Sequence, residues 1–185
     1  MARPIHTADA VVIGGGLHGC ATALYLSKAG LKAVVLEKDH VGRHASGVNA
    51  GGVRSLGRAL PEIPLAVAAL AQWHTIRGLL DDDCGFVSPG QIRIAEDEAG
   101  LRALEARRRT VVDYGFEHEE MIDARELRDL VPAVAPHCVG AMVVRGDGYA
   151  DPFQTVQAFR RKALSLGVRI VENNPLASLK KQSGL

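Results

Sequence analysis

The sequence predicts an α/β fold in which a parallel βαβ unit is interrupted by a smaller α+β block. Three short segments, at residues 9–13, 31–36 and 168–172, are candidates for parallel strands, and the nearly unbroken apolar run of the first is typical of a strand covered on both faces. A helical pattern follows the first run and another precedes the last. Residues 86–146 alternate strand-like and helix-like segments. We therefore expect a parallel sheet flanked by helices, with a second sheet inserted into the chain.

The turn after the first strand carries a glycine pattern typical of dinucleotide sites. Residues 14–19 read Gly-Gly-Gly-Leu-His-Gly and lie between the strand and a helix at 20–28. Gly14 allows the tight turn, Gly16 lets a pyrophosphate approach the backbone, and Gly19 lets the helix pack against the strand. Glu37 ends the second strand, where a carboxylate can accept ribose hydroxyls. The pattern predicts a Rossmann-like FAD/NAD(P)-binding unit; the alternative is a tight turn that binds nothing.

A second glycine-rich loop follows the ribose-binding acid. Residues 42–54 read Gly-Arg-His-Ala-Ser-Gly-Val-Asn-Ala-Gly-Gly-Val-Arg, which is poor in core residues. Such a loop allows backbone N–H groups to lie close to a ligand, and Arg43 and Arg54 would supply positive charge. A flexible surface loop is the alternative. The position of this glycine-rich loop, shortly after Glu37, favours cofactor binding over a flexible surface loop.

Local signals predict the remaining helices and strands. Residues 60–80 predict one helix with an apolar face that includes Trp73, the only tryptophan, which we expect in the core. Asp123 with Glu126 fits a capping box, and Asp151 before a proline fits a helix start. The other predicted elements are a turn and strand within 86–95, a charged helix within 96–115, and strands at 117–122 and 139–145.

Composition excludes several classes of function. A net charge of +1 gives no electrostatic reason to expect binding to nucleic acid or to an anionic membrane. No stretch approaches the length of a membrane-spanning helix, and the N-terminus lacks the apolar core of a signal peptide. We therefore expect a cytoplasmic protein with no integral membrane segment.

The cysteines and an aspartate run do not predict a metal site. Cys20, Cys84 and Cys138 are odd in number and widely spaced, which is typical of a reducing compartment. Cys20 opens the first helix, where a thiolate would be favoured, but we expect it to be a small packing residue beside Gly19. The run Asp81–Asp83 is predicted to be a solvated helix end, because metal ligands come from spaced positions.

Three motifs follow one another along the chain: Val-Val-Ile-Gly-Gly-Gly-Leu-His-Gly at 11–19 with Val-Leu-Glu-Lys at 35–38, the loop at 42–54, and Gly-Tyr-Ala-Asp-Pro at 148–152. Together they resemble the FAD-dependent oxidoreductase family, in particular its D-amino-acid oxidase-like group of sarcosine and glycine oxidases and D-amino-acid dehydrogenases. The resemblance covers most of the chain and does not specify a substrate.

The resemblance implies a set of cofactor-binding residues and a domain division. Residues 1–85 and 147–185 would form the FAD-binding domain, and 86–146 part of a substrate-binding domain. Some relatives attach the flavin through a histidine at the position of Asn49, so we expect FAD to be bound non-covalently, although His44 lies nearby. Catalytic residues stay unassigned, with His44 and Arg54 as candidates by loop position. The implied cofactor-binding residues are Gly14, Gly15, Gly16, Leu17, His18, Gly19, Glu37, Lys38, Arg43, His44, Ala45, Ser46, Asn49, Gly51, Gly52 and Val171.

The resemblance also implies a reaction. The expected substrate is a small amine or amino acid whose C–N bond is oxidised by hydride transfer to the flavin. Family members are much longer than this chain, so it resembles an N-terminal portion that needs a C-terminal half or a partner chain. The alternatives are an FAD-dependent dehydrogenase of 2-hydroxy acids or polyol phosphates, a non-catalytic nucleotide-binding subunit or remnant, and an NAD-dependent dehydrogenase. A hydrolase is poorly supported because no G-x-S-x-G motif is present.

Overall fold

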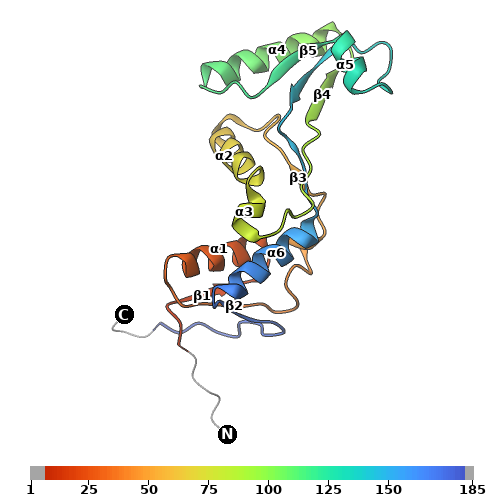
Figure 1. The fold of residues 1–185 in the computed structure, drawn as a ribbon. Helices are drawn as coiled ribbons and strands as arrows, with labels where there is room; N and C mark the ends of the chain where they lie inside the picture. Colours follow the sequence, from red (N-terminus) through yellow and green to blue (C-terminus); the bar gives the residue numbers. More distant parts are fainter. Residues whose placement is uncertain (1–6, 182–185) are drawn as a thin grey trace. The chain divides into compact units, whose positions relative to one another are not determined.

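Two units make up the fold in the computed structural model, which describes residues 7–181 (Figure 1). The first unit comprises the chain up to Gly51, Ile76–Gly85 and the chain from Asp151 onward. The second comprises Gly52–Thr75 and Phe86–Ala150. Residues 52–75 thus group with the inserted block, whereas the sequence predicted a boundary after residue 85. The functional assignment of the two units stays a prediction.

A three-stranded parallel sheet lies at the centre of the first unit, as predicted. Its strands are β1 (Ala10–Ile13), β2 (Ala33–Leu36) and β8 (Arg169–Val171), in the order β1-β2-β8. Val12 pairs with Val35, and Val35 pairs with Ile170. The crossover therefore brings the last strand beside β2, on the side away from β1.

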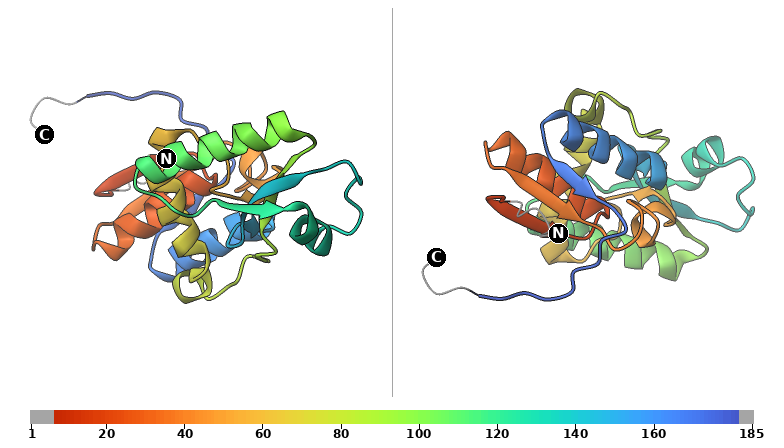
Figure 2. Two further views of the ribbon diagram at one scale, coloured as in Figure 1. Left: turned by 90° about the horizontal axis from the view of Figure 1, so that it is seen from above. Right: turned by 90° about the horizontal axis from the view of Figure 1, so that it is seen from below.

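Helices α1 (Leu17–Lys28) and α6 (Pro152–Ser165) lie side by side on one face of this sheet (Figures 1 and 2). Buried Leu24 and Val156 form part of the core beneath them. The sheet's other face is open within the described residues, because Val11 and Ile13 of β1 are each 56% exposed. The expectation that the first strand is covered on both faces is therefore not met.

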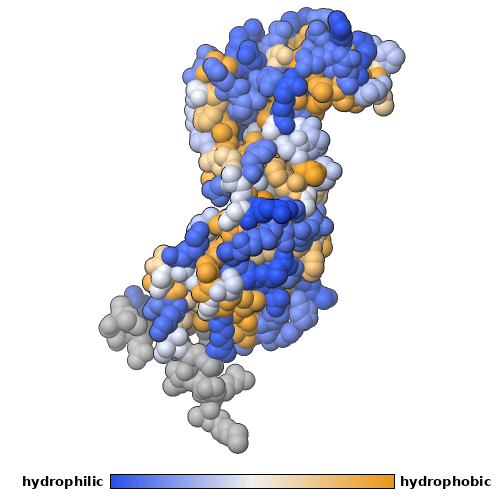
Figure 3. Space-filling view, in the orientation of Figure 1, coloured by the Kyte–Doolittle hydropathy of each residue, from blue (hydrophilic) through white to orange (hydrophobic). Residues whose placement is uncertain are grey.

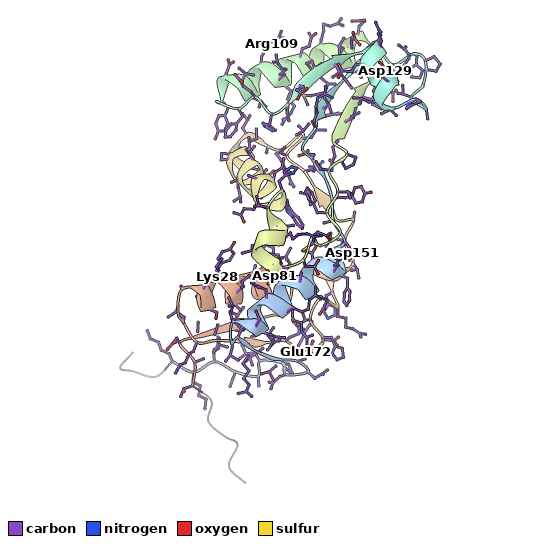
Figure 4. The ribbon with its side chains drawn as sticks, viewed as in Figure 1. Lys28, Asp81, Arg109, Asp129, Asp151 and Glu172 are labelled. Atoms are coloured by element: carbon purple, nitrogen blue, oxygen red, sulfur yellow. The ribbon has the colours of Figure 1, made fainter. Side chains whose placement is uncertain are left out.

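Helix α6 begins as the sequence predicts. The side chain of Asp151, labelled in Figure 4, accepts a hydrogen bond from Gln154 N (2.6 Å), and Pro152 occupies the first turn. The outer side of α6 lies within the hydrophilic band of the first unit in Figure 3. Arg161 and Lys162 of α6 form ion pairs with aspartates that follow α3 (Ile76–Leu80).

The three consecutive aspartates have separate partners. Asp81 pairs with Lys162, Asp82 accepts from Cys84 N (2.7 Å), and Asp83 pairs with an arginine of α3. The hydrogen bond from Cys84 N and the pairing with Arg161 lower the pKa of Asp82. Among residues 7–181 no cluster of three metal-ligating side chains occurs.

The second unit is built on a three-stranded antiparallel sheet. Its order is β4 (Gln91–Ala95), β6 (Gly140–Val144) and β5 (Glu120–Asp123), and every residue of β6 is buried. Helices α4 (Glu98–Asp113) and α5 (Ala124–Leu130) pack against this sheet through Leu104 and Leu127. Their N-caps are Asp97 and Asp123, whose side chains accept from backbone N–H groups of the first turn. The predicted cap at Asp123 is confirmed.

Two features of the chain differ from the sequence prediction. The glycine-rich segments contain a short antiparallel ribbon of β3 (Gly52–Val53) and β7 (Gly148–Tyr149). The single helix predicted over residues 60–80 is wrong, because α2 (Ile63–Trp73) ends before α3 begins. At this break the Thr75 hydroxyl donates to the carbonyls of Ala71 (3.4 Å) and Gln72 (3.2 Å), a local contact that competes with regular helix.

Candidate functional site

The glycine turn after β1 is tight enough to require two of its glycines. Gly14 has a φ of +102°, a conformation that L side chains rarely adopt, and its N–H donates to Leu36 O (2.8 Å). A Cβ atom on Gly19 would lie 1.8 Å from Gly14 O. Helix α1 can therefore approach the end of β1 only because Gly19 has no side chain.

The acid at the end of β2 is fixed toward this turn. Glu37 is 6% exposed and accepts hydrogen bonds from Gly15 N (2.6 Å) and Asp39 N (2.8 Å). Each of these bonds uses one lone pair of a different carboxylate oxygen, and each oxygen has a second. Glu37 can therefore still accept hydrogen bonds from a ligand such as a ribose diol.

The N-terminus of α1 offers donors to an anion. Leu17 N donates to Ser46 Oγ (3.1 Å), so the loop after β2 supplies the acceptor for one first-turn N–H group. The N–H groups of His18 and Gly19 have no acceptor within residues 7–181. Free first-turn N–H groups and the positive end of the helix dipole together bind phosphate groups.

A cavity of about 160 Å³ lies between the turn and the following loop. Two of the basic residues that line it, Arg43 and His44, are exposed and lie beside Asp39, with Arg43 Nε 2.9 Å and His44 Nε2 3.6 Å from its carboxylate. The lining residues are Gly16, Glu37, His40, Gly42, Arg43, His44, Ala45 and Ser46. The cavity therefore combines one buried acid with several groups that can carry positive charge.

Several of the predicted cofactor residues lie away from this lining. The Asn49 side chain donates to Ala45 O (3.1 Å) and Ser46 O (3.0 Å) and accepts from Gly51 N (2.8 Å), so it orders the loop. Lys38 is exposed, and Gly52 belongs to β3 in the second unit.

Val171 and Gly15 have other neighbours in the first unit. Val171 O accepts from Glu37 N (2.9 Å), and Val171 lines a separate cavity on the open face of the sheet with Val11 and Leu36. The Gly15 N–H is used by Glu37, so it is not free for a ligand. Their roles toward a cofactor stay predictions.

Sequence reasoning missed two features of the cavity. His40 lines it, although it was not among the predicted residues. Gly47 repeats the close approach of the first turn, because a Cβ atom there would lie 1.9 Å from Gly42 O. The spacing of Gly42 and Gly47 equals that of Gly14 and Gly19, and this equality is a signal that could have identified the second turn.

Cys20 behaves as a packing residue, as expected. It is fully buried, and burial raises the pKa of its thiol to about 11. Its Sγ lies 3.7 Å from Gly15 O. Burial therefore suppresses the thiolate form, as expected for a packing residue at the start of α1.

The chemistry of the donor set fits an adenine dinucleotide. Glu37 can accept from ribose hydroxyls, and the free N–H groups of α1 lie in the first turn after the glycines, where a pyrophosphate is expected to bind. Arg43 adds a guanidinium group beside the same cavity. The site thus has a partner for both the sugar and the pyrophosphate.

Comparisons with known proteins find a matching family model and several similar proteins. Residues 9–185 match the family model described as FAD dependent oxidoreductase. Glycine oxidase of Bacillus licheniformis is 29% identical over 183 residues, which cover 95% of this chain and 48% of that protein. One opine oxidase subunit, from Agrobacterium tumefaciens, is 27% identical, with 97% of this chain and 51% of that protein covered.

A solved structure shows the same fold. L-amino acid deaminase from Proteus myxofaciens, in complex with anthranilate, superposes with a TM-score of 0.89 at 23% identity, covering 99% of this chain and 42% of that one. The chain spans about half the length of the relatives that it matches. Within residues 7–181, no helix has both the length and the apolar character needed to cross a bilayer.

Proposed function

This chain belongs to the FAD-dependent oxidoreductase family, and we propose that its first unit holds the adenosine diphosphate half of FAD in an enzyme that oxidises small amines or amino acids. The observation that carries the proposal is the pairing of Glu37 with the glycine turn. A buried carboxylate is costly unless it has hydrogen-bond partners, and Glu37 is fixed by two backbone donors while retaining capacity for more.

Each group at the site has a distinct role in this proposal. When bound, FAD supplies the acceptor for a hydride from the substrate C–H beside nitrogen. Glu37 binds the adenosine ribose, and the N–H groups of His18 and Gly19 bind the pyrophosphate. Arg43 lines the cavity, and its guanidinium group, which pairs with Asp39 in the structure, turns toward the phosphate charge.

We propose non-covalent attachment of the flavin. By the family resemblance, Asn49 takes the position at which some relatives carry the attaching histidine, and its amide donates to the carbonyls of its own loop. An amide nitrogen is not a nucleophile, so Asn49 cannot form the bond. The ring of the nearby His44 lies beside the Asp39 carboxylate, which gives it a partner within its own loop.

The protein's substrate and partners also belong to the proposal. We infer that residues 86–146 contribute to the substrate-binding part and that a further polypeptide segment, in the same or another chain, packs on the open face of the β1-β2-β8 sheet. The exposed Val11 and Ile13 support such a contact, since isolated apolar faces of this kind are normally covered. Cys20, Cys84 and Cys138 are all free, which supports a cytoplasmic location.

Flavin binding tests the proposal. The purified 185-residue chain is mixed with FAD, FMN or NAD, and binding is followed by flavin fluorescence or calorimetry. We expect FAD to bind, FMN to bind at least tenfold more weakly because it lacks the adenosine that Glu37 recognises, and ADP to displace FAD. Acid precipitation should release all of the flavin. A chain that binds NAD but not FAD would contradict the proposal.

Turnover is tested separately. We expect little or no flavin bleaching by this chain alone when glycine, sarcosine and a panel of amino acids are added without oxygen. Addition of a 2-hydroxy acid or a polyol phosphate tests the alternative substrate classes. Rapid bleaching by a hydroxy acid, with none by any amine, would replace the amine assignment.

A further inference from the structure

The loop that lines the cofactor cavity is held by α6 and by the segment that follows β8. We use the name cofactor loop for residues 38–47, which include the second glycine turn and the short helix η1 (Ala45–Gly47). Helix η1 packs against α6, and both belong to the first unit. The conformation of the cofactor loop therefore depends on residues that come more than one hundred positions later in the chain.

Side chains from distant elements bind both polar backbone groups of Val41. Val41 is 3% exposed, so its N–H and C=O groups have little access to water. The N–H group donates to Glu172 Oε1 (2.8 Å), and the carbonyl accepts from Gln157 Nε2 (3.0 Å). Buried backbone groups need such partners, because an unpaired group costs the free energy of a lost hydrogen bond. Two side chains thus fix the peptide units on both sides of Val41.

Glu172 is itself fixed from two directions. It follows β8 directly, and it is labelled in Figure 4. While its Oε1 accepts from Val41 N, its Oε2 pairs with Arg160 Nη2 of α6 (3.2 Å). A carboxylate with one donor on each oxygen cannot rotate without losing both contacts. Glu172 therefore connects the cofactor loop to β8 and to α6.

One face of α6 carries all the contacts of this helix with the loop and with Glu172. Four residues of that face have the i, i+3, i+4, i+7 spacing of neighbours on a helix: Phe153, Val156, Gln157 and Arg160. A Cβ atom on Gly42 would lie 3.3 Å from Val156 Cγ1, and one on Gly47 would lie 3.4 Å from Phe153 Cδ2. The second glycine turn is therefore packed closely against the same face that provides the polar contacts.

The backbone after β8 adds contacts at the start of the cofactor loop. Asn173 N donates to Asp39 O (2.9 Å), and Asn174 N donates to Glu37 O (2.8 Å). Together with the two bonds to Val41, these contacts hold every second residue from Glu37 to Val41. The loop thus leaves the buried acid in one defined direction before it reaches the cavity.

We propose that Gln157 and Glu172 are positioning residues of the cofactor site, which hold the cofactor loop in the conformation that binds FAD. This role rests on the proposed function, in which the cavity holds FAD. Both residues lie outside the cavity lining that the described residues form, so they act through the loop. A loop fixed in advance loses less conformational entropy when the ligand binds. If only a fraction of the molecules has the loop in place, the apparent affinity falls by that fraction.

Stopped-flow flavin fluorescence on the 185-residue chain distinguishes positioning from direct contact. Gln157→Ala removes the donor to Val41 O, and Glu172→Ala removes the acceptor of Val41 N. The association rate constant for FAD should fall about tenfold in each variant, because the loss of one hydrogen bond shifts the loop equilibrium by about that factor. The dissociation rate constant should change little, since bound FAD itself holds the loop. A residue that contacts FAD, such as Glu37, should instead alter mainly dissociation.

Two further variants are matched controls. Gln154→Ala, also in α6, removes a similar side-chain hydrogen bond, from Gln154 Nε2 to Asp82 Oδ1 (2.9 Å), away from the cofactor loop. This variant should bind FAD like the parent chain and should have about the same Tm as Gln157→Ala. Glu172→Gln keeps an oxygen that can accept from Val41 N, so it should recover most of the association rate that Glu172→Ala loses.

Amide hydrogen exchange tests the loop contacts without FAD. Exchange is followed by mass spectrometry on peptides that cover residues 38–47 of the chain. These amides should exchange about tenfold faster in Gln157→Ala and Glu172→Ala than in the parent chain, because each variant makes local opening easier. Gln154→Ala and Glu172→Gln should exchange like the parent chain.

The outcomes separate the positioning role from the cofactor proposal. Unchanged association rates in both Gln157→Ala and Glu172→Ala would overturn the positioning role alone, provided that the parent chain binds FAD. Loop exchange that is the same in these variants as in Gln154→Ala would overturn it as well. A parent chain that shows the expected exchange pattern but binds no FAD would refute the cofactor proposal and leave the loop contacts established.

Discussion

Replacing Gly19 with alanine should displace α1 from the glycine turn. The added Cβ would lie 1.8 Å from Gly14 O, and ordinary contact begins at 3.4 Å. The helix or the turn must therefore move by 1.6 Å, the difference between these distances. The backbone fixes the positions of both the added Cβ atom and Gly14 O, so no rotamer change can relieve the contact.

The magnitude follows from two opposing effects. Alanine in a helix is favoured over glycine by about 0.5–1 kcal/mol, whereas overpacking costs about 1–3 kcal/mol. Because the contact is with backbone, we expect the upper part of the second range and a net loss of about 2 kcal/mol for Gly19→Ala. For a chain of this size that corresponds to a decrease in Tm of roughly 4–8 °C.

Gly78→Ala provides the matched control. Gly78 lies in α3 of the same unit, and a Cβ atom there would meet nothing within 4 Å. We expect this variant to be as stable as the parent chain or slightly more stable, as measured by thermal unfolding followed by circular dichroism. FAD affinity should fall in Gly19→Ala and stay unchanged in Gly78→Ala. Equal Tm values for the two variants would show that the contact with Gly14 does not limit the approach of α1.

Three further changes test the buried charges and the buried thiol. Glu37→Gln should weaken FAD binding, measured by calorimetry, at least tenfold. The glutamine NH₂ group cannot accept a hydrogen bond, so it would meet one of the two backbone N–H donors that Glu37 now binds. Unchanged affinity would remove Glu37 from the site. Glu119→Gln should lower the free energy of unfolding, measured in urea, by about 3 kcal/mol because it leaves the guanidinium group of Arg107 without its buried charged partner. The control Glu120→Gln removes an exposed carboxylate and should lower the free energy of unfolding by less than about 1 kcal/mol. Equal losses in the two variants would contradict the buried pairing. Burial raises the pKa of the Cys20 thiol from 9.0 to about 11, so the thiol of the unfolded chain loses its proton at a lower pH than the thiol of the folded chain. The free energy of unfolding should therefore fall as the pH rises from 9.0 to about 11. A Cys20→Ala variant whose stability has the same pH profile would refute this.

The sequence predicted those parts of the fold that depend on neighbouring residues. Asp123 and Asp151 cap their helices through N–H groups three residues ahead, at 2.8 and 2.6 Å, so the signal and the contact lie in one turn. Gly30 and Gly167 follow the ends of α1 and α6 and have positive φ values of 84° and 85°, the conformation for which a glycine after a helix is a local sequence signal. Such contacts form in the same way in any fold that contains the segment.

The parts that were missed depend on partners distant in the chain. The ribbon of Gly52–Val53 with Gly148–Tyr149 has two residues per strand, and neither segment carries a period that could reveal it. The helix over residues 60–80 has a continuous apolar pattern, yet it divides at Thr75. Apolar periodicity reports which side of a segment is buried and does not report where the backbone changes direction.

The two buried acids of the second unit show the same limit at a functional level. In the sequence, Asp147 and Glu119 resemble ordinary surface residues, because acids are rarely buried. In the fold both are buried, and burial of a carboxylate is tolerated only when it is hydrogen-bonded. Their backbone partners all lie in the turn between Arg54 and Arg58. Each acid therefore depends on the backbone donors of the turn, and the two acids in return fix the conformation of the turn. The positions of the two arginines are thus set by residues that lie more than sixty positions later in the chain. Those residues cannot be recognised as partners until the fold is known.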